Sequence, residues 1–99
     1  MGKFMLDQNR TPILVEDIIQ WGRFLEQDRR VDLTIINGAS ISTVFLGLDH
    51  GYGDHIHPVL YETMVFSRNE DEPCWRYTSE EEARIGHLKV VAMLENPND

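Results

Sequence analysis

Apolar positions recur at helical spacing in two stretches of the chain, one near each end. The first stretch places five apolar or small residues on one face, with Trp21 and Phe24 beside it: Val15, Ile18, Ile19, Gly22 and Leu25. This spacing predicts an amphipathic helix over residues 16–28. Glu16 and Asp17 stand at its start, where the helix dipole favours negative charge.

The second helical stretch follows Ser79. Ser79 and Glu82 have the spacing of a capping box, which predicts that a helix opens at residue 78 or 79. Its expected buried stripe consists of Ala83, His87, Val90, Val91 and Leu94. Asn96-Pro97 ends the helix, because proline cannot continue it, and residues 96–99 form a short tail.

Between the helices the pattern changes to two β-prone runs, residues 31–36 and 39–48, separated by Asn37-Gly38. Both central residues of a type I′ turn need φ > 0, and Asn-Gly tolerates this best. The predicted pairs on one side are Ile35 with Ser40, Leu33 with Ser42 and Val31 with Val44. Those on the other side are Ile36 with Ala39, Thr34 with Ile41 and Asp32 with Thr43. We expect the first side, continued by Leu46 and Leu48, to face the core.

A third strand is expected from residue 58 or 59 to residue 66, and a fourth over 74–77, while residues 1–10 hold a short strand and a turn. The order α-β-β-β-β-α predicts one α+β domain over residues 1–99. In this fold a four-stranded, mostly antiparallel sheet carries both helices on one face. The opposite face is then partly apolar and uncovered. Such a face needs a partner, so we expect another protein or a homodimer there.

Composition narrows the classes of partner. The 99 residues include 17 acidic and 9 basic side chains, a net charge of −8, and only two lysines. Direct nucleic-acid binding is disfavoured, because it depends on Lys and Arg that neutralise phosphates. Acidity favours solubility or a partner with a basic groove. The single cysteine, Cys74, excludes an intramolecular disulfide, and no apolar run approaches the ~18 residues of a membrane span, so we expect a cytoplasmic protein.

Residues 49–57 form the most unusual segment, Asp-His-Gly-Tyr-Gly-Asp-His-Ile-His. Histidine and aspartate are good ligands for a divalent metal, which makes His50, His55 and His57 candidate ligands. No zinc-protease motif such as His-Glu-x-x-His accompanies them. The alternative is a polar loop whose imidazoles are solvated or bind backbone groups, and we expect no cofactor on that interpretation.

Glu62 lies in the apolar run 59–66, on the strand face of Leu60 and Met64. Burial there would tune a carboxyl for acid–base chemistry. If the strand ends fold together, Asp49, His50 and Glu62 could form a small-molecule, nucleotide or metal site. The alternative pairs Glu62 with Arg76 across the sheet. The chain has no strong catalytic motif, so a binding protein is favoured over an enzyme.

Three stretches of the chain resemble a family of small uncharacterised proteins from tailed bacteriophages and prophages. They are Ser42 through His50, Glu62 through Phe66, and Trp75-Arg76-Tyr77-Thr78 followed by Glu81, Glu82, Ala83 and Gly86-His87. The resemblance covers residues 11–94. It implies a small acidic accessory protein that acts by binding a protein of the bacterial host, for example as an inhibitor of a defence protein.

The chain departs from the family pattern in the loop before the third strand. The family tends to have Gly, an acidic residue and Gly-Pro-Pro, whereas residues 53–58 are Gly-Asp-His-Ile-His-Pro, and Ser67 replaces a glycine. His55 and His57 therefore fall outside the motif. The polar positions that match it are Asp49, His50, Gly53 and Glu62. With the neighbouring Tyr52, these are the candidate binding residues.

Overall fold

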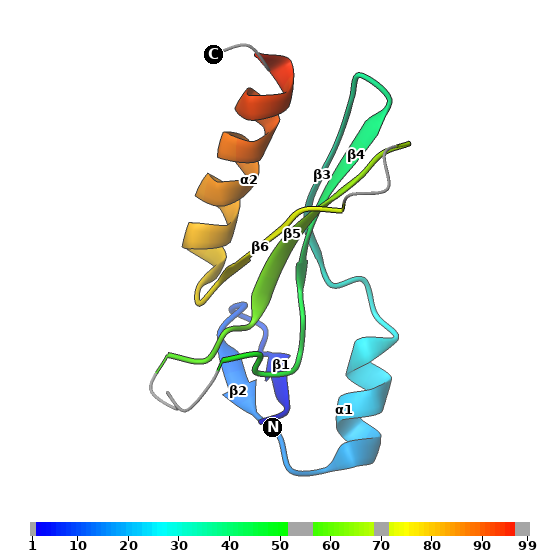
Figure 1. Cartoon of the computed structure of the whole chain (residues 1–99). Coiled ribbons are helices and arrows are strands. Elements are labelled where there is room, and N and C mark those ends of the chain that lie inside the picture. The colour runs from blue at the N-terminus through cyan, green and yellow to red at the C-terminus, as the bar shows by residue number, and fades with distance from the viewer. Residues whose placement is uncertain (1, 52–56, 69–71, 97–99) are drawn as a thin grey trace.

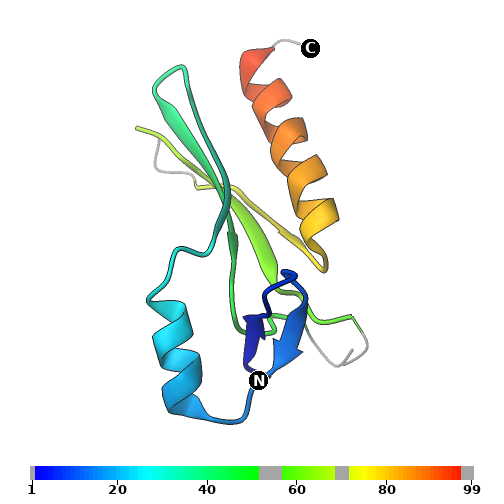
Figure 2. The same cartoon turned by 180° about the vertical axis from the view of Figure 1, so that it is seen from behind.

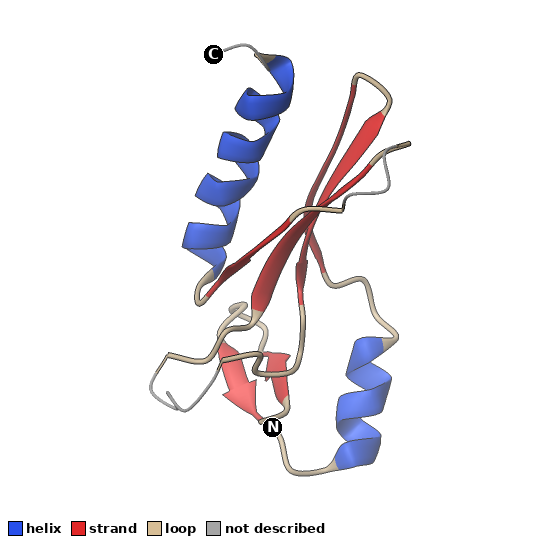
Figure 3. Cartoon of the chain, viewed as in Figure 1, coloured by secondary structure: helices blue, strands red, loops and turns tan. Residues whose placement is uncertain are grey.

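The computed structural model describes residues 2–51, 57–68 and 72–96. The elements in chain order are β1 (Phe4–Leu6), β2 (Pro12–Leu14), α1 (Ile18–Leu25), β3 (Arg30–Ile36), β4 (Ala39–Phe45), β5 (Tyr61–Phe66), β6 (Cys74–Tyr77) and α2 (Glu80–Glu95) (Figure 1). Strands β3 to β6 form an antiparallel sheet in sequence order, and β1 pairs with β2 in a separate two-stranded sheet. The predicted α+β class is confirmed (Figure 3). Strand β2 is an element that the sequence analysis did not predict.

The β3–β4 hairpin has the predicted turn and most of the predicted register. Asn37 and Gly38 have φ values of 51° and 79°, as a type I′ turn requires. The pairs from Ile36–Ala39 to Asp32–Thr43 are confirmed. A bulge between Arg30 and Asp32 then places Arg30, not Val31, opposite Val44. A bulge adds one unpaired residue to a strand, so the predicted Val31–Val44 pair is wrong, and Val31 packs against Phe45 and its buried neighbours instead.

The prediction of the core face of this hairpin is also wrong. The buried residues of β4 are Ala39, Ile41, Thr43 and Phe45. Leu33 and Ile35 lie on the opposite face and are 41% and 71% exposed. The reason is that α2 covers the face with the threonines and supplies hydrogen-bond partners for them. Counting apolar side chains within the hairpin alone favours the other face.

Helix α2 crosses the sheet and closes the core. Its N-cap is Ser79, whose Oγ accepts a hydrogen bond from the Glu82 backbone N–H at 3.1 Å, so the predicted cap is confirmed. The helix starts beside the end of β6 and ends beside the β3–β4 turn, where Asn37 Nδ2 donates to the Leu94 carbonyl at 3.2 Å (Figures 1 and 2). Its buried side chains include Ala83, His87 and Val90 from the predicted stripe.

Helix α1 is shorter than predicted and lies at the opposite end of the sheet from the β3–β4 turn (Figure 2). Among the described helices and strands, its backbone approaches only β1. Two side chains hold it: Trp21 Nε1 donates to the Gly47 carbonyl at 3.1 Å, and the Phe24 ring meets Phe45 edge-on at 5.9 Å. Ile18 and Ile19 are exposed. Helix α2 therefore packs along the sheet face on which both helices were expected, whereas α1 reaches the Phe45 end of that face through Phe24.

Candidate functional site

Asp49 closes the base of the loop that was expected to carry a site. Its Oδ1 accepts hydrogen bonds from the backbone N–H groups of Gly51 and Val59, at 2.8 and 2.9 Å. The His50 N–H donates to the Val59 carbonyl at 3.0 Å. These bonds join the two sides of the loop, so one oxygen of the carboxylate has a structural role. Of the other candidates here, Tyr52, Gly53 and His55 lie outside the described residues.

Glu62 forms the cross-strand ion pair that the sequence analysis offered as its alternative. It lies opposite Arg76 in the β5–β6 register. Arg76 Nε is 2.9 Å from Glu62 Oε2, and the glutamate side chain is 12% exposed. The pair lies on the sheet face away from α2. At this distance the positive charge of Arg76 balances the negative charge of the Glu62 carboxylate. The ion pair favours a structural role for Glu62 over acid–base chemistry.

The candidate ligands do not meet as a metal centre in the part of the chain that the structure describes. Residues 2–51, 57–68 and 72–96 contain no group of three His, Cys, Asp or Glu side chains that could hold a metal ion. His50 is half-buried and His57 is exposed. Asp49, His50 and Glu62 are therefore not brought together as metal ligands.

A buried polar network that the sequence analysis missed lies between α2 and the sheet. His87 Nδ1 is 2.7 Å from Thr43 Oγ1, and its Nε2 is 2.9 Å from Thr34 Oγ1. Thr43 Oγ1 contacts Thr63 Oγ1 at 2.5 Å, and the Tyr77 hydroxyl donates to Thr63 at 3.1 Å. Both ring nitrogens of His87 therefore face threonine hydroxyls, Nδ1 that of Thr43 on β4 and Nε2 that of Thr34 on β3.

This network includes the residue types of a hydroxyl–histidine–carboxylate triad, since Asp32 Oδ2 is 3.7 Å from His87 Nε2. Catalysis requires a nucleophile that a substrate can reach. Thr43, Thr63 and His87 are fully buried. We therefore assign the network to the core, where it fixes α2 on the sheet. The sequence signal was present: His87 falls on the buried stripe of α2, and Thr43 alternates with Ile41 and Phe45.

One ion pair joins the β1–β2 turn to the start of α2. Arg10 contacts Glu80 Oε1 through Nε at 2.7 Å and through its terminal nitrogen at 2.6 Å, and Arg84 Nε adds a contact of 3.4 Å to Glu80 Oε2. The hydrogen bond from Arg10 holds the pKa of Glu80 below its ordinary value. Burial, with a smaller contribution from Glu80, raises the pKa of Tyr61 to about 12. The Arg10–Glu80 ion pair therefore joins two segments that are 70 residues apart in the chain.

The sheet face away from α2 carries exposed apolar side chains. We call it the outer face and define it by ten residues: Leu33, Ile35, Ser40, Ser42, Val44, Glu62, Met64, Phe66, Cys74 and Arg76. Ile35, Ser40 and Phe66 form one row across three strands, and Leu33, Ser42 and Met64 form the next. Phe66 is 44% exposed. In both rows a serine of β4 lies between larger apolar side chains of β3 and β5.

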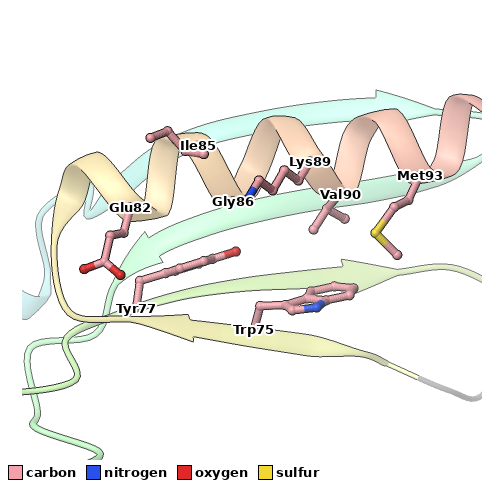
Figure 4. Close-up of a pocket in the computed structure, with 8 residues that line it drawn as sticks. All are labelled: Trp75, Tyr77, Glu82, Ile85, Gly86, Lys89, Val90 and Met93. Atoms are coloured by element: carbon pink, nitrogen blue, oxygen red, sulfur yellow. The ribbon is translucent and has the colours of Figure 1, made fainter.

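A groove runs between α2 and the edge strand β6 (Figure 4). It has a volume of about 340 Å³ and is lined by Trp75, Tyr77, Glu82, Ile85, Gly86, Lys89, Val90 and Met93. We call it the β6 groove. At its closed end Tyr77 lies directly against Gly86, where a Cβ would overlap the phenol ring. Towards Met93 the ribbons of α2 and β6 diverge (Figures 1 and 4).

Comparisons with protein-family models, with curated proteins and with solved structures give no match. Within the described residues, no helix is long and apolar enough to cross a membrane. The function is therefore inferred from the surfaces and side chains described above.

Proposed function

We propose that this protein acts by binding another protein through its outer face. One observation carries the proposal: Leu33, Ile35 and Phe66 are large apolar side chains, each more than 40% exposed, on one face of the sheet, with Ser40 between Ile35 and Phe66. Exposing apolar surface to water costs free energy, and contiguous exposed apolar patches mark interaction sites. A sheet supplies a pre-formed surface, so little conformational entropy is lost on binding.

The net charge of −8 favours a basic partner. Opposite charges steer two proteins together and speed their association. A second copy of this chain carries the same negative charge, which opposes self-association at low salt. We therefore favour a different protein as the occupant of the outer face, and a homodimer is the alternative that the experiment distinguishes.

The resemblance to small proteins of tailed bacteriophages supports a partner from the bacterial host, met in the host cytoplasm. On this proposal the protein is an accessory factor that occupies a surface of a host protein, such as a defence protein, and blocks its action. The small-molecule or enzymatic alternative at Asp49, His50 and Glu62 is less favoured, because Asp49 and Glu62 engage the loop backbone and Arg76.

The test compares two single variants for binding to host proteins. Ile35→Thr removes apolar surface from the outer face but keeps a β-branched side chain suited to a strand. Leu88→Gln is the matched control, because Leu88 is an exposed aliphatic residue of α2 outside the outer face. Affinity purification from host cells, followed by titration of the purified pair, is expected to give at least tenfold weaker binding for Ile35→Thr alone.

Analytical ultracentrifugation of the isolated protein completes the test. A monomer that binds a host protein supports the proposal, and a dimer lost in Ile35→Thr assigns the outer face to self-association instead. Equal binding by the wild type and by Ile35→Thr would remove the outer face from the proposal. A protein that engages no host protein and leaves phage growth and host defence unchanged would contradict the function as a whole.

A further inference from the structure

The two edges of the four-stranded sheet differ in how they meet solvent. At the β3 edge a bulge separates Arg30 from Asp32, and the Asp32 carboxylate accepts the Leu33 backbone N–H at 2.8 Å. Bulges and charged side chains of this kind discourage pairing with a further strand. Strand β6 pairs with β5 on one side, and among the described residues no strand lies beyond it. The β6 edge is therefore more accessible than the β3 edge for pairing with a further strand.

The β6 groove lies directly beside this open edge. Trp75 and Tyr77 supply its floor from β6, and Ile85, Val90 and Met93 line its wall on α2 (Figure 4). In Figure 4 the Met93 side chain points towards the Trp75 ring across the groove. Ile85 and Met93 are both at least half-exposed. One extended ligand can thus contact both the backbone edge of β6 and the apolar side chains of the β6 groove.

We propose that the β6 groove accepts an extended segment of a partner polypeptide, which adds to β6 as a fifth strand. Main-chain hydrogen bonds to the edge would provide affinity, and alternate side chains would provide specificity, because every second side chain points to the α2 side. In the new strand pair, one apolar side chain of the ligand would lie opposite Trp75. This side chain would cover the indole ring and Met93. This inference concerns the sheet edge and α2, so it does not depend on the proposed use of the outer face.

Charges at the two ends of β6 define the ligand more closely. Glu72 precedes the strand, and Glu81 and Glu82 follow it, all of them exposed. Lys89 lies beside the middle of the groove. A complementary segment carries Lys or Arg at both ends and uncharged, alternately apolar residues at its centre.

The same charges disfavour a second copy of this chain as the occupant. An antiparallel pair of two β6 strands would bring Glu72 of one copy towards Glu81 and Glu82 of the other. Like charges at close range across a strand pair are destabilising. A segment of a different protein that carries basic residues at both ends would instead pair with the acidic residues at both ends of β6.

A displayed library of random decapeptides, selected on the full-length protein, is the probe for this site. We expect enriched peptides that alternate apolar residues at the centre and carry Lys or Arg at the ends. Each enriched peptide is then synthesised beside a copy with a central proline, which cannot complete a strand ladder. Fluorescence anisotropy is expected to show at least tenfold weaker binding of the proline copy.

Two protein variants and one backbone measurement locate the bound peptide. Trp75→Thr and Met93→Gln are expected to weaken binding at least tenfold, whereas Leu88→Gln and Ile35→Thr are expected to leave it unchanged. Amide hydrogen exchange should slow at residues 74–77 when the peptide binds, because strand addition engages the β6 backbone. Circular dichroism of each variant checks that it remains folded.

Several results would overturn the inference. These are a selection that enriches no peptide, equal binding of the proline copies, and peptides that protect only amides of α2, which would indicate a helix or a side-chain site. A dimer of the free protein that exchanges slowly at 74–77 would assign the edge to a second copy. Loss of binding in Ile35→Thr with retention in Trp75→Thr would move the peptide to the outer face.

Discussion

The two faces of the four-stranded sheet depart from a simple division into an apolar inside and a polar outside. The face under α2 buries Thr43, Thr63 and the imidazole of His87. The outer face exposes Leu33, Ile35 and Phe66 to solvent. The difference teaches that burial in this small domain is decided by what lies over each face. The apolar content of the strands alone does not decide it.

The buried polar groups are tolerated because they are satisfied. Across the described residues, no buried side-chain nitrogen or oxygen lacks a hydrogen-bond partner. An unpaired polar group in a core costs about 1–3 kcal/mol, whereas a paired one contributes a small net stabilisation. Among the described residues, nothing covers the exposed apolar side chains of the outer face. The partner proposed above would cover them.

The largest expected contrast compares two phenylalanines, one on each face. Phe45 is fully buried and contacts the rings of Phe24 and Tyr61, so Phe45→Ala should lower the free energy of unfolding by about 3–5 kcal/mol. Phe66→Ala on the outer face should cost about 1 kcal/mol or less. Urea denaturation of the two variants measures both values. Similar losses would show that the outer face is part of the folding core.

Neighbouring hydroxyl residues of β4 offer a second contrast. Thr43→Val keeps the side-chain shape but leaves His87 Nδ1 without a partner and removes one of the two hydrogen bonds of the Thr63 hydroxyl, which should cost about 2 kcal/mol. Ser42→Val, one residue away and facing outwards, should change stability by about 0.5 kcal/mol or less, because valine also suits a strand. Thermal and urea unfolding measure the difference. Equal effects would contradict the assigned orientation of β4.

The sequence was sufficient where one local rule decides the structure. Asn37-Gly38 determined the turn and most of the hairpin register, Ser79 determined the start of α2, and β6 has the bounds predicted for it. Each of these features depends on residues close together in the chain. The ion pair of Glu62 with Arg76 was also foreseen as an alternative, because cross-strand partners follow from the register.

The rest depended on contacts between distant segments. The core face of the hairpin was misassigned because the threonines on that face need a hydrogen-bond partner when they are buried. His87 supplies this partner, and it lies 53 residues after Thr34 in the chain. The bulge beside Val31 has no signature in the local pattern. Ile18 and Ile19 have helical spacing, yet α1 buries Trp21 and Phe24 more than these two residues. Periodicity identifies an amphipathic helix without identifying the surface that receives it.

The ion pair at the start of α2 predicts a smaller, pH-dependent effect. The pKa of Glu80 is lowered by Arg10, so its contribution to stability is present above the ordinary carboxyl pKa and is lost as the pH falls through the lowered value. The pair is partly exposed, which limits the expected loss in Glu80→Gln to about 0.5–1 kcal/mol at pH 7. Arg10→Gln and the double variant complete a mutant cycle. A difference from wild type that persists at pH 2 would contradict the ion-pair origin.

The smallest expected effect is spectroscopic and reports on burial at the α2 face. Burial raises the pKa of Tyr61 to about 12, because an ionised phenol is poorly solvated beside Phe45 and Leu60. A raised pKa contributes stability below the ordinary tyrosine value of about 10, and that contribution is lost as the pH rises towards 12. Absorbance of phenolate at 295 nm should show a late component that disappears in Tyr61→Phe. Titration of that component near pH 10 in the folded protein would place Tyr61 in solvent and contradict the packing of this end of the core.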